Sequence, residues 1–323
     1  MAGWENVSCA LCGQAGAETV LTIPCASAPD GMSAVKACRH CGLRRLEPRP
    51  DRNLIGTFYA AAGGDNYNAY QGRRRSARTQ ALWNFLRDGA ARPARSSTIG
   101  KLLAPLTGAI ANWAFDINVL LDRQIGRRVL EVGAGYGDIL IYLRERGCEV
   151  LGTDLSPSAV AKAAEYGVEV RLGVLHDLGL PAAAFDAAIM CHSLEHVPDP
   201  NVELAELARL LKPGGTLHIA VPNGHAVRLD SDGVNFAHLS FPLHYWFFDA
   251  ESLAKLLRKH GFQIAKGPWT TTRHHAFKAW LSGLRTGPVA ATRQFWRFLA
   301  TTARRPHGGD VLRVIAQKPR TDS

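Results

Sequence analysis

The sequence predicts an α/β fold in which helices cover both faces of a largely parallel β-sheet, with a small metal-binding unit in front of it. Two observations predict this architecture. From residue 127 onward, short apolar runs alternate with amphipathic segments, as in RRVLEVGAG followed by DILIYLRERG. Before that, residues 1–50 hold two Cys-x-x-Cys pairs and show no helical periodicity. Strands and helices that alternate along a chain typically build a parallel sheet with helices on both faces.

Changes in composition divide the chain into three expected regions. Residues 1–50 form the cysteine-containing unit, residues 51–126 a helical linker and cap, and residues 127–323 the α/β domain. The α/β domain includes a basic helical segment at about residues 266–310. Within the linker, residues 101–121 are apolar but are interrupted by proline and polar side chains. A bilayer-spanning helix needs about twenty predominantly apolar residues, so no transmembrane span is expected here.

Length and cysteine content point to a globular protein of the cytoplasm. A chain of 323 residues with 46% hydrophobic content can bury a core of ordinary size. The N-terminus lacks the basic and apolar regions of a secretory signal. Seven cysteines are an odd set, and four of them lie in Cys-x-x-Cys pairs. This usage suits metal binding in a reducing compartment better than a disulfide framework.

Positive charge is concentrated at the C-terminal end. The net charge is +10, and residues 266–323 contribute +9 of it through eleven Lys and Arg against two Asp. Such a surface can simply confer solubility, or it can attract phosphorylated or lipid-linked substrates, an anionic membrane surface or nucleic acid. Because aromatic residues interleave with arginines between residues 278 and 305, these helices could rest on the inner membrane face as a peripheral contact or pack beside the sheet.

A glycine-rich loop follows the first strand of the α/β domain. Gly133 and Gly135 allow a tight turn and a close approach of a ligand to the backbone. Asp154 ends the next strand, where a carboxylate can accept hydrogen bonds from both hydroxyls of a ribose. Glu131 stands just before the glycines, and its charge would repel a diphosphate but suit a sulfonium and an amino group. The pattern therefore predicts a nucleoside ligand with a cationic group.

The paired cysteines predict a structural zinc site. Cys9 and Cys12 are separated by twenty-five residues from Cys38 and Cys41. Two such knuckles can bring four thiolates into tetrahedral contact with one zinc ion. Free thiols and a redox role are the alternatives, and Cys25 would be a superfluous fifth thiolate.

The segment CHSLEHVPDP contains the order His-x-x-Glu-His that is also found in a class of zinc peptidases. Those enzymes carry both histidines on one helix. Here Pro198 and Pro200 follow too closely for a stable helix, because each proline disfavours helical backbone in the residue before it. The segment is therefore expected to be the loop after the strand FDAAIM, with His196 either lining a pocket or holding a structural hydrogen bond.

Four motifs in one order carry a family resemblance. They are EVGAGYG, TDLS, FDAAIMCHSLEHVPDP and LLKPGGTLHIAVPN, and they lie within residues 127–223. Together they resemble the class I S-adenosylmethionine-dependent methyltransferases. This resemblance implies a Rossmann-like seven-stranded sheet with S-adenosylmethionine bound at the carboxyl ends of its first strands. The implied cofactor-binding residues are Glu131, Gly133, Ala134, Gly135, Asp154, Leu155, Asp177, Cys191 and His192.

The resemblance also assigns roles within that set. The glycine loop contacts the methionine part of the cofactor, Asp154 the ribose and Leu155 one face of the adenine. Asp177 stands where relatives often contact the adenine amino group, although it could equally be a turn or capping residue. Cys191 and His192 line the side of the methyl donor.

The N-terminal pattern resembles a branch of the same family that carries a zinc ribbon before the catalytic domain. CALCG and CRHCGLRRLEPRP, followed by FYAA, carry this resemblance. Members of the branch include sugar C-methyltransferases, natural-product enzymes and enzymes of cell-surface polysaccharide pathways. The chain is short for the large C-terminal domain of the sugar C-methylating group.

Candidates for a general base lie in the segment NFAHLSFPLHYWFFD. Methyl transfer from a sulfonium needs no metal, and it needs a base only where the acceptor must lose a proton. His238, His244 and Tyr245 lie in this segment, and His196 is a fourth candidate; a packing role is the alternative for each. We favour His244, because the pKa of a histidine suits proton transfer near neutrality.

These observations predict an S-adenosylmethionine-dependent methyltransferase that acts by in-line displacement. The expected acceptor is a small molecule, a sugar or a glycan, including a lipid-linked one. An RNA methyltransferase is the second hypothesis, although the chain shows no separate nucleic-acid recognition motif. A non-catalytic binding module is the third, and the intact glycine loop and Asp154 argue against it.

Overall fold

The structure is a computed structural model. It describes most of the expected cysteine-containing unit and most of the expected α/β domain. The described residues are 3–61, 126–236, 238–271, 287–290, 292–293, 296 and 307–320. The predicted linker helices beyond residue 61, the apolar stretch 101–121 and most of the basic helices of residues 274–305 lie outside these ranges. Within the described part of the chain, no helix is both long enough and apolar enough to cross a membrane.

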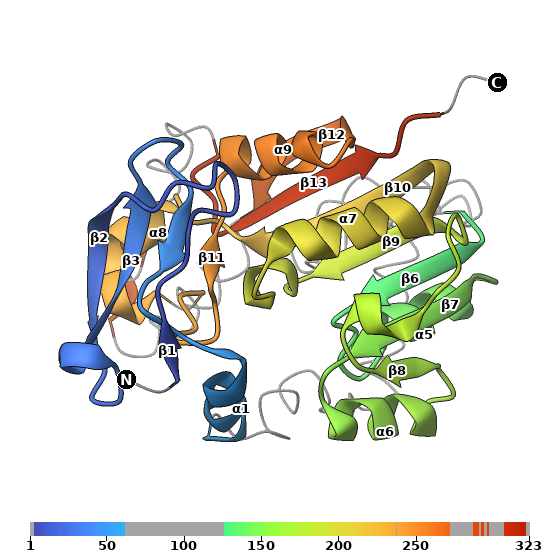
Figure 1. The fold of residues 1–323 in the computed structure, drawn as a ribbon, viewed down its shortest axis with the longest axis horizontal. Coiled ribbons are helices and arrows are strands. Elements are labelled where there is room, and N and C mark those ends of the chain that lie inside the picture. Colours follow the sequence, from blue (N-terminus) through green and yellow to red (C-terminus); the bar gives the residue numbers. More distant parts are fainter. Residues whose placement is uncertain are drawn as a thin grey trace.

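The larger sheet confirms the predicted seven-stranded α/β fold (Figure 1). Its strands in spatial order are β12 (Gln263–Thr271), β13 (Val311–Gln317), β10 (Leu211–Pro222), β9 (Phe185–Cys191), β6 (Arg128–Val132), β7 (Glu149–Asp154) and β8 (Val170–Leu172). The five strands from β10 to β8 run parallel, whereas β13 is antiparallel to both of its neighbours. The parallel strands are nearly continuous apolar runs because both of their faces are covered.

Helices cover both faces of this sheet. They are α5 (Asp138–Arg144), α6 (Pro157–Glu165), α7 (Pro200–Leu210) and α9 (Ala250–Lys259). Successive strand residues point to opposite faces, so Val129 and Leu130 belong to different cores. Val129 packs in one cluster with Ile139 and Tyr142 of α5, while Leu130 belongs to the cluster that contains side chains of α7 and α9.

Local signals set the helix starts. Ser156 and Asp199 cap α6 and α7 with their side-chain oxygens, and a proline follows each as the first helical residue. Asp249 and Ser252 form a reciprocal capping box at the start of α9. The helix α7 ends at Leu210, because Lys212-Pro213-Gly214-Gly215 belongs to β10. Proline and glycine disfavour helix, so the chain enters the strand at that point.

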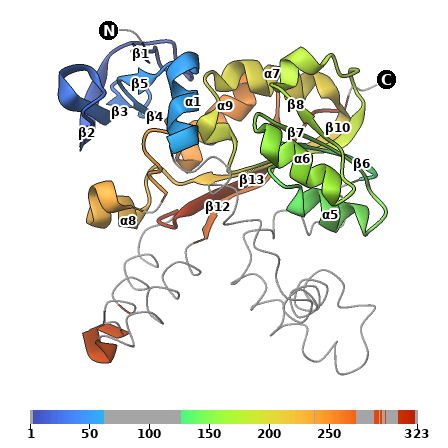
Figure 2. The same ribbon diagram turned by 90° about the horizontal axis from the view of Figure 1, so that it is seen from below.

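The N-terminal region forms a smaller antiparallel sheet in the order β11-β4-β3-β2. Its strands are β2 (Ala17–Pro24), β3 (Met32–Cys38), β4 (Arg44–Leu46) and β11 (Trp246–Phe247). The fourth strand, β11, therefore comes from the distant segment before α9 (Figure 1). A separate pair, β1 (Trp4–Glu5) and β5 (Arg49–Pro50), leads into α1 (Arg52–Ala61), which lies between the small sheet and the larger domain (Figure 2). The segment before β11 also contains α8 (Val227–Asp232).

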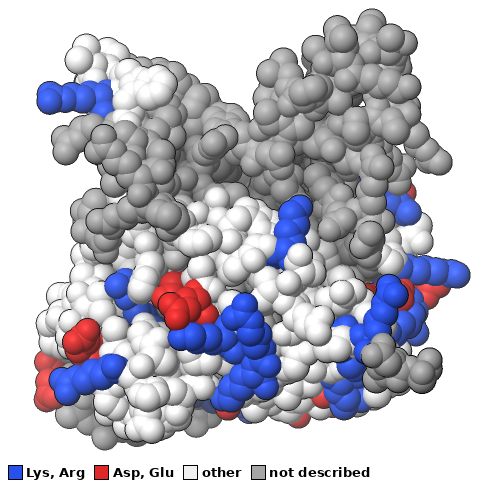
Figure 3. Space-filling view, turned by 90° about the horizontal axis from the view of Figure 1, so that it is seen from above, with Lys and Arg blue, Asp and Glu red and all other residues white. Residues whose placement is uncertain are grey.

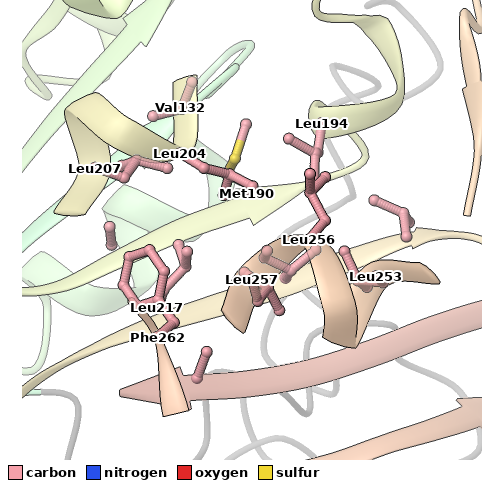
Figure 4. Close-up of a cluster of buried hydrophobic side chains, with 14 of the residues drawn as sticks. Val132, Met190, Leu194, Leu204, Leu207, Leu217, Leu253, Leu256, Leu257 and Phe262 are labelled. Carbon is pink, nitrogen blue, oxygen red and sulfur yellow. The ribbon is translucent and has the colours of Figure 1, made fainter. Parts of the chain in front are cut away.

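The largest apolar cluster lies between the larger sheet and the helices α7 and α9 (Figure 4). Leu204 and Leu207 of α7 meet Leu256 and Leu257 of α9 over Leu217 of β10, and all five are fully buried. Burial of a leucine side chain stabilises a fold by roughly 1.5–3 kcal/mol. This cluster holds the ends of β9 and β10 in place.

Replacement of Leu256 tests the weight of this cluster. We expect Leu256→Ala to lower the free energy of unfolding by about 2–5 kcal/mol, because it leaves a cavity among side chains that cannot collapse fully. Val202→Ala is the control, since Val202 lies on α7 but is 45% exposed, and its cost should stay below about 0.5 kcal/mol. Denaturant unfolding at constant zinc measures both. Equal losses in the two variants would contradict the cluster's role.

Glu203, on the first turn of α7, is a buried carboxyl in this region. Burial, and then the nearby Glu206 carboxylate, raise the pKa of Glu203 to about 7. The unfolded chain would ionise this group near its usual pKa of about 4.3. The folded protein therefore favours the neutral carboxylic acid of Glu203. The contribution of Glu203 to the free energy of unfolding is fully present only below the pKa that Glu203 has in the unfolded chain.

The pH dependence of unfolding checks this assignment. As pH rises from about 4 through 7, the Glu203 contribution to the free energy of unfolding should fall by up to about 4 kcal/mol and level off above the folded pKa. Glu203→Gln removes the titration, so the wild-type minus variant difference should carry this slope. Parallel pH profiles for the two proteins would show that Glu203 titrates normally.

Candidate active site and cysteine cluster

The carboxyl ends of β6 and β9 mark the switch point of the larger sheet. From β6 the chain proceeds to β7 on one side, whereas β9 is followed by β10 on the other. Ligands of open α/β sheets bind in the crevice at such a point. Glu131, the Gly133–Gly135 loop and Cys191 lie at these strand ends, and Asp154 ends the adjacent strand β7. These predicted cofactor-binding positions thus lie at the edge of the sheet where open α/β folds bind their ligands.

Backbone hydrogen bonds shape the glycine loop. The N–H groups of Gly133 and Ala134 donate to the carbonyl of Thr153 at 2.8 and 2.9 Å. The N–H of Gly135 donates to Oδ2 of Asp154 at 2.7 Å. Gly133 has a φ of +73°, and a Cβ there would lie only 2.6 Å from Cβ of Ser193. Only glycine fits, and the loop lies directly against the turn that follows β9.

Glu131 is a buried carboxyl beneath this loop. Its side chain is 3% exposed, and its Oε2 has no hydrogen-bond partner within the described ranges. Burial, and then the neighbouring Asp138 and Asp154 carboxylates, raise the pKa of Glu131 well above its usual value. A cationic group in the crevice would relieve both effects, so the site suits a positively charged ligand.

The predicted adenine contacts lie further out. Leu155 follows Asp154 and is 67% exposed, so its apolar surface faces outward at the edge of the strand ends. Asp177 lies in the 3-10 helix Leu175–Leu178 with an exposed side chain, and its Oδ1 is 3.4 Å from Nε2 of His176.

A buried carboxylate surrounded by histidines lies just beyond the glycine loop. Glu195 and His196 belong to the 3-10 helix η4 (Leu194–His196), and His244 comes from the segment before β11. One potential ligand atom from each of these three side chains lies within 4.8 Å of the other two. We refer to Glu195, His196 and His244 as the glutamate–histidine cluster. Beside it, Nδ1 of His192 is 3.4 Å from Oε1 of Glu195.

The cluster holds one negative charge among neutral imidazoles. Burial by itself raises the pKa of Glu195, but His192, His196 and His244 lower it to about 2. Burial, followed by His196, lowers the pKa of His244 to about 3, and burial also lowers that of His196. At neutral pH Glu195 is therefore ionised and both histidines of the cluster are neutral.

The other two base candidates are positioned differently. His238 accepts a hydrogen bond from Nδ1 of His244 through its carbonyl oxygen, at 2.9 Å, and its ring stacks on that of His192. Tyr245 donates its phenolic proton to the carbonyl of Pro50 at 2.9 Å. Burial raises the pKa of Tyr245 above its usual value. The Tyr245 side chain thus faces the N-terminal region and not the cluster.

The four paired cysteines converge at the end of the small sheet. Their sulfur atoms lie within 4.8 Å of one another, with Cys9 and Cys41 3.4 Å apart and Cys12 and Cys38 3.5 Å apart. Each pair closes a similar knuckle. The N–H of Gly13 donates to the backbone carbonyl of Cys9, and the N–H of Gly42 donates to the backbone carbonyl of Cys38. Tetrahedral ligands at 2.3 Å from zinc would be about 3.8 Å apart. The donor set therefore fits one zinc ion.

A family model described as a methyltransferase domain matches residues 96–266, more than half of the chain. The chain therefore belongs to this methyltransferase family. An enzyme of Xanthomonas axonopodis pv. citri named ubiquinone biosynthesis O-methyltransferase is 36% identical over 152 residues, which are 43% of this chain and 64% of the relative. An enzyme of the same name from Alkalilimnicola ehrlichii is 39% identical over 99 residues, which are 28% of this chain and 39% of the relative. The chain thus spans less than two thirds of these relatives.

Solved structures of the same class resemble the methyltransferase at low sequence identity. A S-adenosylmethionine-dependent methyltransferase from Archaeoglobus fulgidus is 20% identical with a TM-score of 0.46, covering 73% of this chain and 99% of the other. One from Mesorhizobium loti is 20% identical with a TM-score of 0.44, covering 60% and 92%.

Two residues of the site were not predicted from the sequence. Ser193 is buried against Gly133, and its Oγ has no hydrogen-bond partner in the described part of the methyltransferase. Tyr59, on α1, places its hydroxyl 3.0 Å from Nδ1 of His196. Ser193 lies inside the recognised CHSLEH motif, but nothing in the sequence connects Tyr59 with His196.

Zinc content provides the test of the cysteine cluster. We expect Cys9→Ser to lose the metal of this cluster and to unfold more readily, because a structural zinc contributes directly to folding. Cys25→Ser is the matched control, since Cys25 contacts Ser27 and lies outside the cluster. Elemental analysis of purified protein measures both. Full zinc retention in Cys9→Ser would rule the site out.

Proposed function

We propose that this methyltransferase transfers a methyl group from S-adenosylmethionine to a hydroxyl oxygen of a small organic acceptor. The observation that carries the proposal is the direct contact between the glycine loop and the turn that holds Glu195, made through Gly133 and Ser193. A donor at the loop and an acceptor at the glutamate–histidine cluster would therefore be neighbours. The curated relatives, named as O-methyltransferases, support an oxygen acceptor.

The donor side has groups for each part of the cofactor. The buried Glu131 carboxyl suits the positive charge of the methionine portion, and the glycine loop lets that portion approach the backbone. Asp154, held by the N–H groups of Gly135 and Ser156, would accept hydrogen bonds from the ribose hydroxyls. Leu155 offers exposed apolar surface to the adenine. When bound, S-adenosylmethionine supplies an electrophilic methyl group on a sulfonium.

On the acceptor side, the chain's task is to orient the hydroxyl and help remove its proton. His244 is the candidate whose Nε2 faces the Glu195 carboxylate, at 3.9 Å, but burial lowers its pKa to about 3, which makes it a weaker base than the histidine expected from the sequence. Tyr245 is a weaker candidate, since its proton is committed to Pro50. In-line displacement gains most from holding donor and acceptor close and excluding water, and Glu195 is fully buried.

Binding partners other than a small acceptor would contact the basic C-terminal surface, of which the structure describes a part. On the face drawn in Figure 3, Lys and Arg side chains are spread out and several lie beside acidic ones. On α9, Lys255 and Glu251 form one such ion pair. Peripheral binding to an anionic membrane would rest on residues 266–310, most of which lie outside the described ranges. Sugar, glycan, lipid-linked and RNA acceptors are alternatives that an acceptor panel would reveal.

Calorimetry with S-adenosylhomocysteine tests the donor site. We expect one-to-one binding that Asp154→Ala weakens at least tenfold, about 1.4 kcal/mol, because the ribose loses its carboxylate and the glycine loop its anchor. Glu169→Ala is the control, as the exposed Glu169 carboxylate pairs with the nearby Arg171 on the surface. The decisive contrary result would be equal affinity in Asp154→Ala and wild type. Methylation of a catechol or phenol panel then tests the acceptor class.

A further inference from the structure

We propose that the α/β domain completes the zinc site, because Asn201 of α7 and Lys259 of α9 hold the first cysteine knuckle in the form that binds the metal. Zinc affinity would then depend on two side chains that lie more than 150 residues from the cysteines in sequence. The inference rests on the zinc ion assigned to the four-cysteine cluster, and it is independent of the acceptor that the enzyme methylates.

Two side chains of the α/β domain bind the backbone of the first knuckle, residues 9–13. Nδ2 of Asn201 donates to the carbonyl oxygen of Ala10 at 2.9 Å. Nζ of Lys259 donates to the same oxygen at 3.0 Å and lies 3.5 Å from the carbonyl oxygen of Leu11. Lys259 also donates to Oδ1 of Asn201 at 2.8 Å. The two side chains therefore form one unit that holds two successive carbonyls of the knuckle.

These contacts reach the peptide groups that bind the sulfur of Cys9. Burial raises the pKa of the Cys9 thiol, and hydrogen bonds from the backbone N–H groups of Cys12 and Leu11 to its sulfur act in the opposite direction. The N–H of Leu11 shares its peptide group with the carbonyl of Ala10, and the N–H of Cys12 shares one with the carbonyl of Leu11. Each peptide thus donates to the sulfur at one end and meets the Lys259 ammonium at the other. Hydrogen bonds linked in this way polarise and strengthen one another.

A positive charge on this side of the knuckle suits the bound metal. A zinc ion with four thiolate ligands carries a net negative charge, and the Lys259 ammonium brings the opposite charge to the knuckle backbone. Residues that orient metal ligands from outside typically change metal affinity by about 10- to 100-fold. Arg39 and His40, at the corresponding positions of the second knuckle, are exposed. The α/β domain therefore acts on the zinc site through the first knuckle.

Asn201 extends this contact to the start of α7. It is the second residue of that helix, and its backbone N–H and its Nδ2 both lie 2.9 Å from Oδ1 of the capping residue Asp199. The turn η4, which carries Glu195, ends shortly before this cap. A coupling free energy acts equally in both directions. If the ordered start of α7 strengthens zinc binding, bound zinc must also strengthen the start of α7.

The rate of zinc release from the full-length protein to a chromogenic chelator tests the two side chains. We expect Lys259→Ala and Asn201→Ala each to release zinc about tenfold faster than wild type, because the first knuckle loses its hydrogen bonds to the α/β domain. Arg258→Ala is the matched control, since Arg258 is an exposed cation of the same turn of α9, and it should keep the wild-type rate. Circular dichroism before chelation checks that all variants are folded. Equal rates in Lys259→Ala and Arg258→Ala would overturn the proposal.

Hydrogen exchange on wild type tests the reverse direction and needs no variant. Removal of zinc should accelerate amide exchange in residues 194–204, because the start of α7 loses its support on the knuckle. Residues 157–165 of α6, which packs on β7 and β8, serve as the internal control and should keep their protection. Unchanged exchange in residues 194–204 after zinc has left would overturn the coupling.

The outcomes also separate this inference from the claims on which the article's other tests bear. Wild type that binds no zinc would remove the zinc site and the role of Asn201 and Lys259 together. Bound zinc with equal release rates would remove only that role. S-adenosylhomocysteine binding tests the donor site independently of both results.

Discussion

The arrangement of the acceptor side depends on a two-residue strand that belongs to both halves of the molecule. β11 pairs with β4 of the small sheet through Trp246 and Phe247. The residue before it, Tyr245, donates its N–H to the carbonyl of Glu195 and accepts from the N–H of Leu46. One peptide segment thus joins the N-terminal sheet to the turn that carries the buried carboxylate. The position of Glu195 relative to His244 follows from this linkage.

Further contacts make the cysteine-containing region part of the catalytic domain's framework. Arg49 donates to the carbonyl of Pro198 and lies over the ring of Tyr245. The knuckle carbonyl of Ala10 accepts from Asn201 of α7 and from Lys259 of α9. Cys9 and Cys38 also belong to the same apolar cluster as the leucines of these helices. A metal that orders the knuckles would therefore stiffen the walls of the crevice as well.

Most of the fold and the donor side could be predicted from the sequence, because their signals are local. The glycine loop, Asp154 and the alternation of strands and helices each lie within a few residues of chain, as does each Cys-x-x-Cys knuckle. The β4–β11 pairing could not be predicted, since a two-residue strand carries no periodicity. The meeting of Glu195 with His244, and of His196 with Tyr59, depends on tertiary contacts between distant segments. His244 and His196 were recognised as separate chemical candidates, but their meeting at the Glu195 carboxylate was not.

The shared strand also bears on how the chain reaches its native state. During synthesis, residues 1–50 leave the ribosome well before Trp246 and Phe247, which pair with the edge of their sheet at β4. Contacts between segments so far apart in sequence slow folding, because a long loop must close before they form. Until then β4 presents an open edge that could pair with another chain. Because the same segment pairs with β4 and binds the carbonyl of Glu195, we expect the small sheet and the acceptor side to be completed together.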